Sequence, residues 1–239
     1  MKDGAGLIRI LKDGPYLVTG GIPLKEKIIT PQGAGYIYRD GAVFPQAETY
    51  TLCRCGKSKN PPFCDGQHQG FDGTETAERL PFAERAEYLR GDKIDLMDDH
   101  RCAFARFCHR AGGDAWELAE NSPNPGDKEE AILAAVECPA GRLVPIDKQT
   151  GRPIEPYYEP GIDVLQDPEE GVSCGLFVKG GIPIQSSDGT TYEVRNRVVL
   201  CRCGASKDKP FCDMMHLAIG YGDGRQNGEG AALQERGQK

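Results

Sequence analysis

One motif occurs twice in this chain, and the duplication constrains the fold more than any other feature. Residues 52–68 (LCRCGKSKNPPFCDGQH) and 200–216 (LCRCGASKDKPFCDMMH) match at 12 of 17 positions without a gap. A second matching stretch lies upstream in both copies, at residues 18–23 (VTGGIP) and 178–183 (VKGGIP). The spacing between the two stretches is 12 residues longer in the first copy. Such a repeat predicts two modules of the same kind within one chain.

Each module is predicted to be a small β-rich fold. The Gly-Gly-Ile-Pro stretches indicate turns, and the β-branched and aromatic residues near them indicate short strands. Strands are expected at residues 16–18, 35–39, 49–52, 176–178, 191–194 and 197–200.

The repeated motif consists largely of metal-ligating residue types. Each copy reads Cys-x-Cys-x2-Ser-x3-Pro-x-Cys-Asp-x2-His, which supplies three thiolates and one imidazole. The candidate ligands are Cys53, Cys55, Cys64 and His68 in the first copy, and Cys201, Cys203, Cys212 and His216 in the second. Three sulfurs and one nitrogen suit either a 2Fe-2S cluster or a single structural zinc. The single residue between the first two cysteines is tighter than zinc sites commonly use, which favours iron.

This pattern resembles the signature of the CDGSH iron–sulfur (NEET) family. The first copy matches it in full, and the second departs from it at Met214, where the family has glycine. The resemblance implies one 2Fe-2S cluster per motif, with Cys53 and Cys55 on one iron and Cys64 and His68 on the outer one. It implies the same for the second copy. It also implies a monomer that mimics, within one chain, the pseudo-twofold arrangement of dimeric family members.

The other motif residues support such a site. Asp65 and Asp213 follow the third cysteine and are expected to cap a short helix that carries the histidine. Ser58 and Ser206 are expected to donate hydrogen bonds to thiolate or sulfide, the alternative being plain turn residues. A positive φ at Met214 would be strained, so either the local backbone differs there or the second cluster has a different exposure and potential.

Histidine ligation predicts a pH-dependent site. A neutral imidazole in place of a thiolate makes a cluster easier to reduce, and a histidine that protonates makes its potential depend on pH. Our hypothesis is that His68 and His216 couple electron transfer to protons and make the clusters labile in mild acid.

The residues from 79 to 150 differ in composition from the two modules and are expected to form an inserted domain. They include a predicted helix at 128–137. Cys102, Cys108 and Cys138 resemble the cysteine pattern of a divergent, single-cluster ferredoxin-like domain, with Ala105 in place of a further cysteine. Three thiolates suit a 3Fe-4S cluster, or a 4Fe-4S cluster with a fourth ligand other than cysteine. The alternative is a degenerate domain that has lost its metal and buries its cysteines. Cys174 is expected to be a structural thiol.

The predicted fold class is α+β, with two β-rich modules in pseudo-twofold arrangement and a ferredoxin-like α+β insertion. The expected divisions are module 1 at 1–78, the insertion at 79–150, a linker and module 2 at 151–221, and a disordered tail at 222–239. The proline-rich stretch from 153 to 171 is expected to be the extended linker.

Composition excludes several classes of function. The chain has 29 Lys and Arg against 36 Asp and Glu, a net charge of −7, which argues against a nucleic acid or an anionic membrane as partner. No run of apolar residues is long enough for a membrane span, and the charged N-terminus is unlike a signal peptide. A soluble, cytoplasmic protein is expected.

The sequence shows no phosphate-binding loop, Ser-His-Asp pattern or nicotinamide fingerprint, so we expect no enzyme. The predicted function is electron transfer or cluster transfer between redox or cluster-acceptor proteins. Two alternatives remain, a zinc-stabilised interaction module and a redox sensor.

Overall fold

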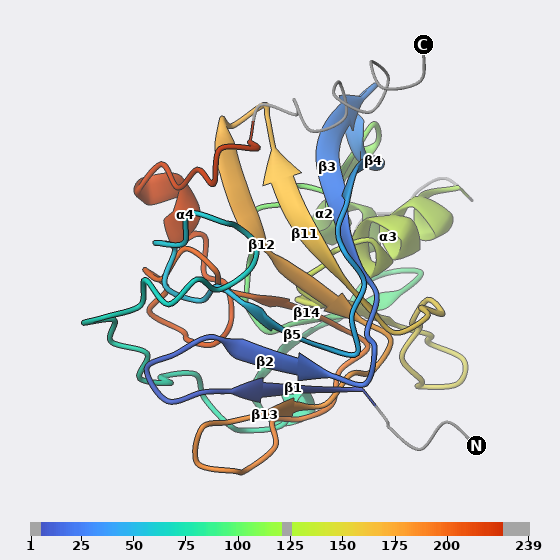
Figure 1. Cartoon of the computed structure of the whole chain (residues 1–239). Coiled ribbons are helices and arrows are strands. Elements are labelled where there is room, and N and C mark those ends of the chain that lie inside the picture. Colours follow the sequence, from blue (N-terminus) through green and yellow to red (C-terminus); the bar gives the residue numbers. More distant parts are fainter. Residues whose placement is uncertain (1–5, 121–125, 227–239) are drawn as a thin grey trace.

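Strands make up most of the regular structure. The computed structural model describes residues 6–120 and 126–226 (Figure 1). The strands are β1 (Leu7–Ile10), β2 (Tyr16–Thr19), β3 (Leu24–Gln32), β4 (Gly35–Val43), β5 (Thr49–Leu52), β6 (Glu87–Leu89), β7 (Asp95–Asp98), β8 (His109–Arg110), β9 (Gly113–Asp114), β10 (Leu143–Ile146), β11 (Gly161–Asp167), β12 (Val172–Lys179), β13 (Ile184–Gln185) and β14 (Arg197–Leu200). The helices are short: α1 (Phe82–Arg85), α2 (Ala115–Glu120), α3 (Asp127–Val136) and α4 (Met215–Ala218).

The two modules exchange strands. One sheet has the order β13-β1-β2-β5, and the other has the order β14-β12-β11-β3-β4. β13, from the second module, pairs in parallel with β1, with Ile184 opposite Ile8. β3, from the first module, pairs in parallel with β11, with Leu24 opposite Ile162. Each sheet is therefore completed by chain from the other module, and the two sheets meet in the lower half of Figure 1.

The extra residues of the first module lengthen its contribution to this exchange. They extend β3 and add β4 in a long antiparallel hairpin, whereas β13, which follows the matching Gly-Gly-Ile-Pro turn, has only two residues. The hairpin stands at the far edge of the second sheet (Figure 1).

One hydrophobic core serves both modules. It joins Ile8 and Tyr16 of the first module to Leu176 and Leu200 of the second, all of them buried. The Tyr16 hydroxyl donates a hydrogen bond to the Cys201 carbonyl at 2.7 Å, so the first module also holds the second motif in place. Burial of apolar surface, rather than a flexible connection, keeps the modules together.

The prediction of an extended linker from 153 to 171 is wrong in its second half. β11 lies inside the second sheet, between β12 and β3, and all of its residues are buried. Its acidic residues suggested a solvated segment, but Asp163 is paired with Lys179 and Asp167 with Arg106. Partners distant in sequence compensate for the burial of these charges.

The insertion has a sheet and a core of its own and is joined to the second module by contacts such as the ion pair of Arg106 and Asp167. β6, β7 and β10 make a three-stranded antiparallel sheet, and α2 and α3 pack against it over a core that includes Ile94, Leu96 and Leu143. α3 lies where the sequence predicts a helix at 128–137.

The folded structure extends into the tail that the sequence predicts to be disordered. Residues 222–226 are described, and the buried Asp223 carboxylate pairs with Arg202. The remainder of that prediction, 227–239, lies outside the described residues.

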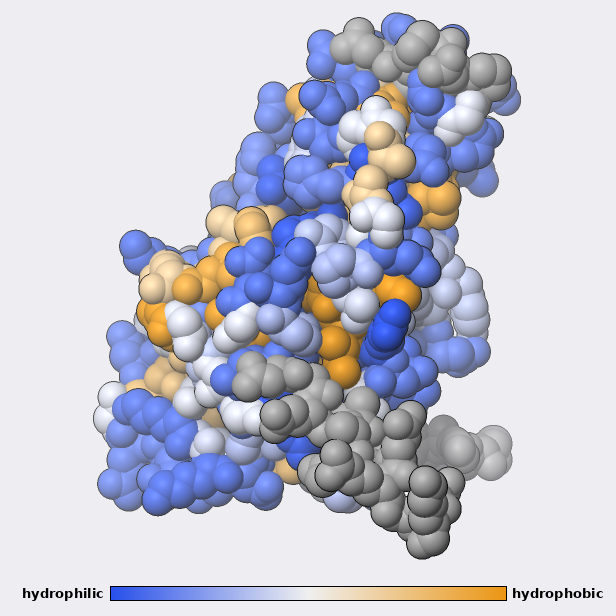
Figure 2. All heavy atoms as spheres, turned by 90° about the horizontal axis from the view of Figure 1, so that it is seen from above, coloured by the Kyte–Doolittle hydropathy of each residue, from blue (hydrophilic) through white to orange (hydrophobic). Residues whose placement is uncertain are grey.

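Figure 2 shows one face of the molecule, on which hydrophobic residues form small patches between hydrophilic ones. Within residues 6–120 and 126–226, none of the helices has the length and apolar character needed to cross a bilayer.

Candidate metal centres

The structure brings the predicted CDGSH ligands together in pairs. In the first motif, the sulfurs of Cys53 and Cys55 are 3.7 Å apart, and the Cys64 sulfur lies 3.5 Å from His68 Nδ1. In the second motif the corresponding distances are both 3.5 Å, between Cys201 and Cys203 and between Cys212 and His216.

These spacings fit shared metal ions. Two thiolates bound tetrahedrally to one metal at about 2.3 Å lie about 3.8 Å apart, and a thiolate and an imidazole nitrogen about 3.5 Å apart. The four ligands of a motif do not converge on one point, however. Within the described part of the chain, no group of three or more His, Cys, Asp or Glu side chains could hold a single metal ion.

The two motif loops have the same backbone arrangement. In each, the first cysteine N–H donates to the carbonyl of the proline that precedes the third cysteine by two residues, at 2.8 Å. The peptide bond before that proline is cis in both copies, at Pro62 and at Pro210. The hydrogen bond joins the segment of the first ligand pair to that of the second in each loop.

Glycines bring the two loops into contact. Gly56 has a φ of +74°, and a Cβ there would lie 2.5 Å from the Cys203 carbonyl oxygen. Gly204 has a φ of +81° and is related in the same way to the Cys55 carbonyl. Because the glycines directly follow cysteine ligands, this backbone contact joins the two motifs at their ligand loops.

A buried arginine lies between the first two cysteines of each motif, and the sequence analysis missed both. Arg54 donates to the carbonyls of Leu11, Gly14 and Gly73. The signal was available, since a charged residue at the same place in both copies is unusual beside metal ligands.

The second arginine, Arg202, has a charged partner. It donates to the carbonyls of Cys174 and Leu165 and forms an ion pair with Asp223, and both side chains are 1% exposed. Only the second motif, among the described residues, therefore has a carboxylate on the arginine of its Cys-Arg-Cys segment.

The predicted role of the serine hydroxyls is wrong. Ser58 donates to the Phe63 carbonyl at 2.6 Å and Ser206 to the Phe211 carbonyl at 2.7 Å, so neither proton is available to a sulfur. The hydroxyls hold the turn instead. Sulfur receives other donors: the Cys203 thiol and then the backbone N–H groups of Ser206 and Gly204 lower the pKa of Cys201, although burial acts in the opposite direction. A lowered pKa favours the thiolate that binds metals.

The expectation that the aspartates cap a helix is wrong: the N-cap of α4 is Met214, without a side-chain cap hydrogen bond, and each aspartate accepts instead from the backbone N–H two residues on. Asp65 Oδ1 accepts from the Gln67 N–H and Asp213 Oδ1 from the Met215 N–H, both at 3.2 Å. A helix, α4, follows only in the second motif. Met214 precedes it with a φ of +70°, close to the +85° of Gly66, so the backbone is left-handed at this position in both copies, and the two copies diverge only after it.

The two sites differ in exposure. Cys212 and His216 are 5% and 2% exposed, whereas Cys64 and His68 are half-buried. Burial, and then the nearby Arg202 charge, lower the pKa of His216 to about 4, which keeps its imidazole neutral as a metal ligand must be. Its Nε2 is buried without a hydrogen-bond partner. The second site thus differs from the first in the exposure of its Cys–His ligand pair, as well as in the helix that carries His216.

The three cysteines of the insertion also come together. Cys102, Cys108 and Cys138 line one cavity, and Ala105 lies in its wall, where the sequence analysis noted a missing cysteine. Burial, and then the neighbouring Cys138 and Cys102 thiols, raise the pKa of Cys108 to about 12. Such mutual proximity of partly buried thiols is what a cluster site requires.

The loop that begins at Cys102 has an unusual backbone. Phe104 and Arg106 have φ values of +57° and +63°, and the Phe104 N–H donates to the Cys102 sulfur at 3.3 Å. Left-handed residues turn backbone N–H groups toward an anion, an arrangement found at iron–sulfur sites. Cys174, by contrast, is buried in a hydrophobic cluster under the second sheet, as expected of a structural thiol.

Comparison with protein families agrees with this geometry. The family described as iron-binding zinc finger, CDGSH type, matches residues 13–69 and 175–217, and the family described as divergent 4Fe-4S mono-cluster matches residues 89–148. Neither the curated proteins nor the solved structures that were searched gave a match.

The fold and the cysteine sites thus define an iron–sulfur protein. More closely, the chain is a tandem CDGSH protein in which a divergent single-cluster segment is inserted between the two motifs.

Proposed function

We propose that each CDGSH motif holds one 2Fe-2S cluster and that the protein transfers electrons or clusters between redox or cluster-acceptor proteins. Cys53, Cys55, Cys64 and His68 would hold the first cluster. Cys201, Cys203, Cys212 and His216 would hold the second. Such a cluster supplies reversible one-electron storage when bound.

The pairing of the ligands carries this proposal. A structural zinc needs four donors around one ion, whereas a 2Fe-2S cluster needs two donors at each of two irons. Each motif offers two pairs with the spacing of shared metal ions and, within the described residues, no group of three donors around one point. The arrangement supports 2Fe-2S clusters over the zinc alternative.

We propose a third cluster, of the 3Fe-4S type, at Cys102, Cys108 and Cys138. The cavity that they line has no Asp, Glu or His among its described lining residues, and Ala105 stands where a fourth ligand would be needed. Three thiolates without a fourth donor favour three irons over four. The insertion around this site would then be a ferredoxin-like domain.

We also propose that the two modules are related by a pseudo-twofold axis within a monomer. The reciprocal exchange of β3 and β13 and the reciprocal contacts of Gly56 and Gly204 support it. Nine of the ten cysteines would be cluster ligands, and a reducing compartment such as the cytoplasm would keep them available as thiolates. A carrier of this kind would be no enzyme and would bind neither nucleic acid nor membrane.

The metal content of anaerobically purified protein tests these assignments. We expect about seven irons per chain, two from each CDGSH motif and three from the insertion, with no zinc. About four irons would overturn the third cluster alone. Two or three zincs without iron would overturn the whole proposal in favour of a structural module.

A further inference from the structure

Arg101 makes a charged contact between the insertion and the second CDGSH motif, beside the apolar contact in which Ala103 and Phe107 share a hydrophobic cluster with Cys212. This arginine directly precedes Cys102 of the insertion. Its Nε donates to the Asp208 carboxylate at 3.0 Å, and its guanidinium carbon lies 4.3 Å from the centroid of the Phe211 ring. Phe211 in turn precedes Cys212. A single guanidinium therefore lies between a residue of the proposed third site and a residue of the second.

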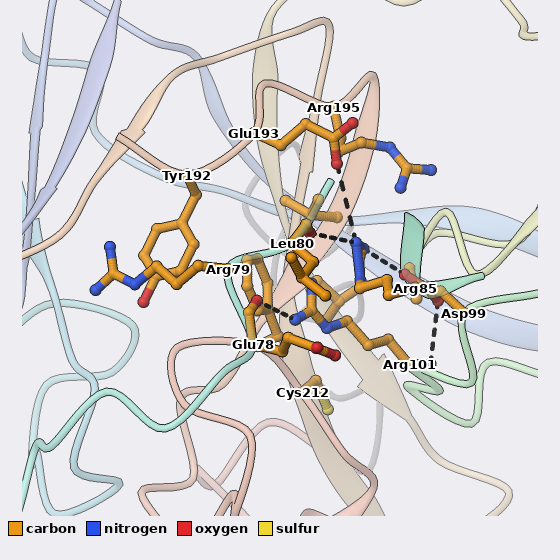
Figure 3. Close-up of a pocket in the computed structure, with 14 residues that line it drawn as sticks. Glu78, Arg79, Leu80, Arg85, Asp99, Arg101, Tyr192, Glu193, Arg195 and Cys212 are labelled. Carbon is orange, nitrogen blue, oxygen red and sulfur yellow. Dashed lines mark hydrogen bonds and ion pairs between the residues drawn. The ribbon is translucent and has the colours of Figure 1, made fainter. Parts of the chain in front are cut away.

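The two sites also share a cavity wall. Cys102 and Cys212 line one cavity together with Arg101 and Asp208. Arg101 and Cys212 also line the adjoining pocket, where Figure 3 shows them in the lower part of the view. The structure thus places Cys102 of the insertion on the same cavity as Cys212, which belongs to the ligand pair that contains His216. Arg101 lines that cavity as well.

The first motif lacks this connection. Asn60 and Phe63 occupy the positions equivalent to Asp208 and Phe211. Phe63 packs edge-on against Phe44 and Tyr50. The first motif reaches the second instead through the backbone contacts of Gly56 and Gly204. The second motif consequently lies between the other two sites, with a different kind of contact on each side.

We propose that the three sites form one path for electrons, with the second CDGSH site in the middle and Arg101 as the positioning residue that couples it to the insertion. This inference rests on the proposed clusters. An electron lost by one site is gained by the next. No bond forms or breaks in this step, and Arg101 keeps its charge throughout, as an arginine guanidinium does in proteins.

The coupling follows from charge and position. A fixed positive charge close to two redox sites stabilises an added electron at either one, and it acts strongly where water is largely excluded. Arg101 has 15% of its side chain exposed. Its side chain is held by the ion pair with Asp208, and its backbone N–H donates to the Asp99 carboxylate. Its removal is therefore expected to change two potentials, although it is not a ligand of either site.

The experiment is a potentiometric titration of the anaerobic holoprotein followed by electron paramagnetic resonance, with iron content measured for each variant. In Arg101→Gln the potentials of the insertion site and of the second CDGSH site should both become more negative, while that of the first site should not change. Asp208→Asn, which removes the opposing charge and recreates the residue of the first motif, should move the same two potentials in the positive direction. The two CDGSH signals are assigned with His68→Cys, which alters only the first.

Arg79→Gln is the matched control. Arg79 lines the adjoining pocket, but its guanidinium lies 4.4 Å from the centroid of the Tyr192 ring and pairs with Asp188, turned away from Cys212 (Figure 3). The same loss of charge there should leave all three potentials in place.

Two results would overturn the coupling: a shift at only one of the two sites, or equal shifts in the Arg79 control. Both are distinct from failure of the proposed function, because wild-type protein with about four irons and no signal from a three-iron cluster would show that the third site itself is missing. If Arg101→Gln loses iron, Asp208→Asn decides the outcome, and unchanged potentials in that variant reject the coupling.

Discussion

Gly56 touches the carbonyl oxygen of Cys203, and no side chain larger than hydrogen fits between them. A Cβ at position 56 would lie 2.5 Å from that oxygen, in a backbone conformation with φ of +74°. The reciprocal relation between Gly204 and Cys55 shows that the contact is a property of the whole interface between the motifs.

Replacing Gly56 with alanine should therefore destabilise the protein for two reasons, a positive φ and an overlap with backbone. Gly66→Ala is the control, since Gly66 has a φ of +85° and nothing within 4 Å of its would-be Cβ. The overlap should cost Gly56→Ala about 1–3 kcal/mol more than the control in the free energy of unfolding. Urea unfolding of both variants measures it, and equal losses would contradict a tight contact.

The ion pair of Arg202 and Asp223 predicts a strong effect at a residue that is not itself a metal ligand. Asp223→Asn leaves a buried guanidinium without its carboxylate, which should cost about 3–5 kcal/mol of stability. Asp40→Asn removes a carboxylate from a pair with Lys27 that is exposed, and it should have little effect. Similar losses of stability in the two variants would show that the buried ion pair of Asp223 contributes no more to stability than the exposed pair of Asp40.

The same aspartate predicts a dependence of stability on pH. Burial alone would raise the pKa of Asp223, but the Arg202 charge and hydrogen bonds outweigh it and lower the pKa to about 2. A carboxyl with a lowered folded pKa stabilises the protein above its unfolded value of about 3.9 and loses that contribution as the pH falls toward 2. Denaturation measured between pH 5 and 2 should be less pH-dependent in Asp223→Asn than in the wild type.

Acid should release the two CDGSH clusters unequally. The pKa of His216 is lowered to about 4, mainly by burial, so its imidazole stays neutral at pH values where an ordinary histidine gains a proton. His68 is half-buried and open to solvent. Cluster absorbance lost between pH 7 and 5 should therefore come from the first site. His68→Cys should abolish this loss and His216→Cys should leave it; the reverse pattern would contradict the assignment.

Ala105→Cys tests the three-iron assignment directly. The alanine is 5% exposed in the wall of the cavity lined by the three cysteines, so a thiol there adds the missing donor. The variant should bind about one more iron per chain and lose the signal of an oxidised three-iron cluster. Ala103→Cys, at a second buried alanine of the same wall, serves as the control. An unchanged iron count in Ala105→Cys would mean that a side chain at position 105 does not reach the place where a fourth iron would bind.

The ligand pairs were predictable because they depend on local spacing. Cys53 and Cys55, or Cys64 and His68, are so close in sequence that a single turn decides their distance. The same holds for the short strands that flank the motif. What the motif residues do beyond ligation was harder to predict, because the Ser58 hydroxyl satisfies a carbonyl that only the folded turn presents.

Structure that depends on distant partners was not predictable. β11 was interpreted as a linker because Asp163 and Asp167 look like solvated residues, yet Lys179 and Arg106 neutralise them within the fold. The position of Arg101 against the second motif likewise depends on how the insertion docks, and no local pattern encodes that. The exposure difference between His68 and His216 follows from the same docking and from the surrounding packing.

The exchange of β3 and β13 also sets an order in time. A ribosome delivers the first motif before the second, but the sheet beside it lacks its edge strand until Ile184 and Gln185 emerge. The first module must therefore wait, with an open edge, for the second. Iron would reach a finished first site only after the second module has been made, so both CDGSH sites mature together despite their separation along the chain.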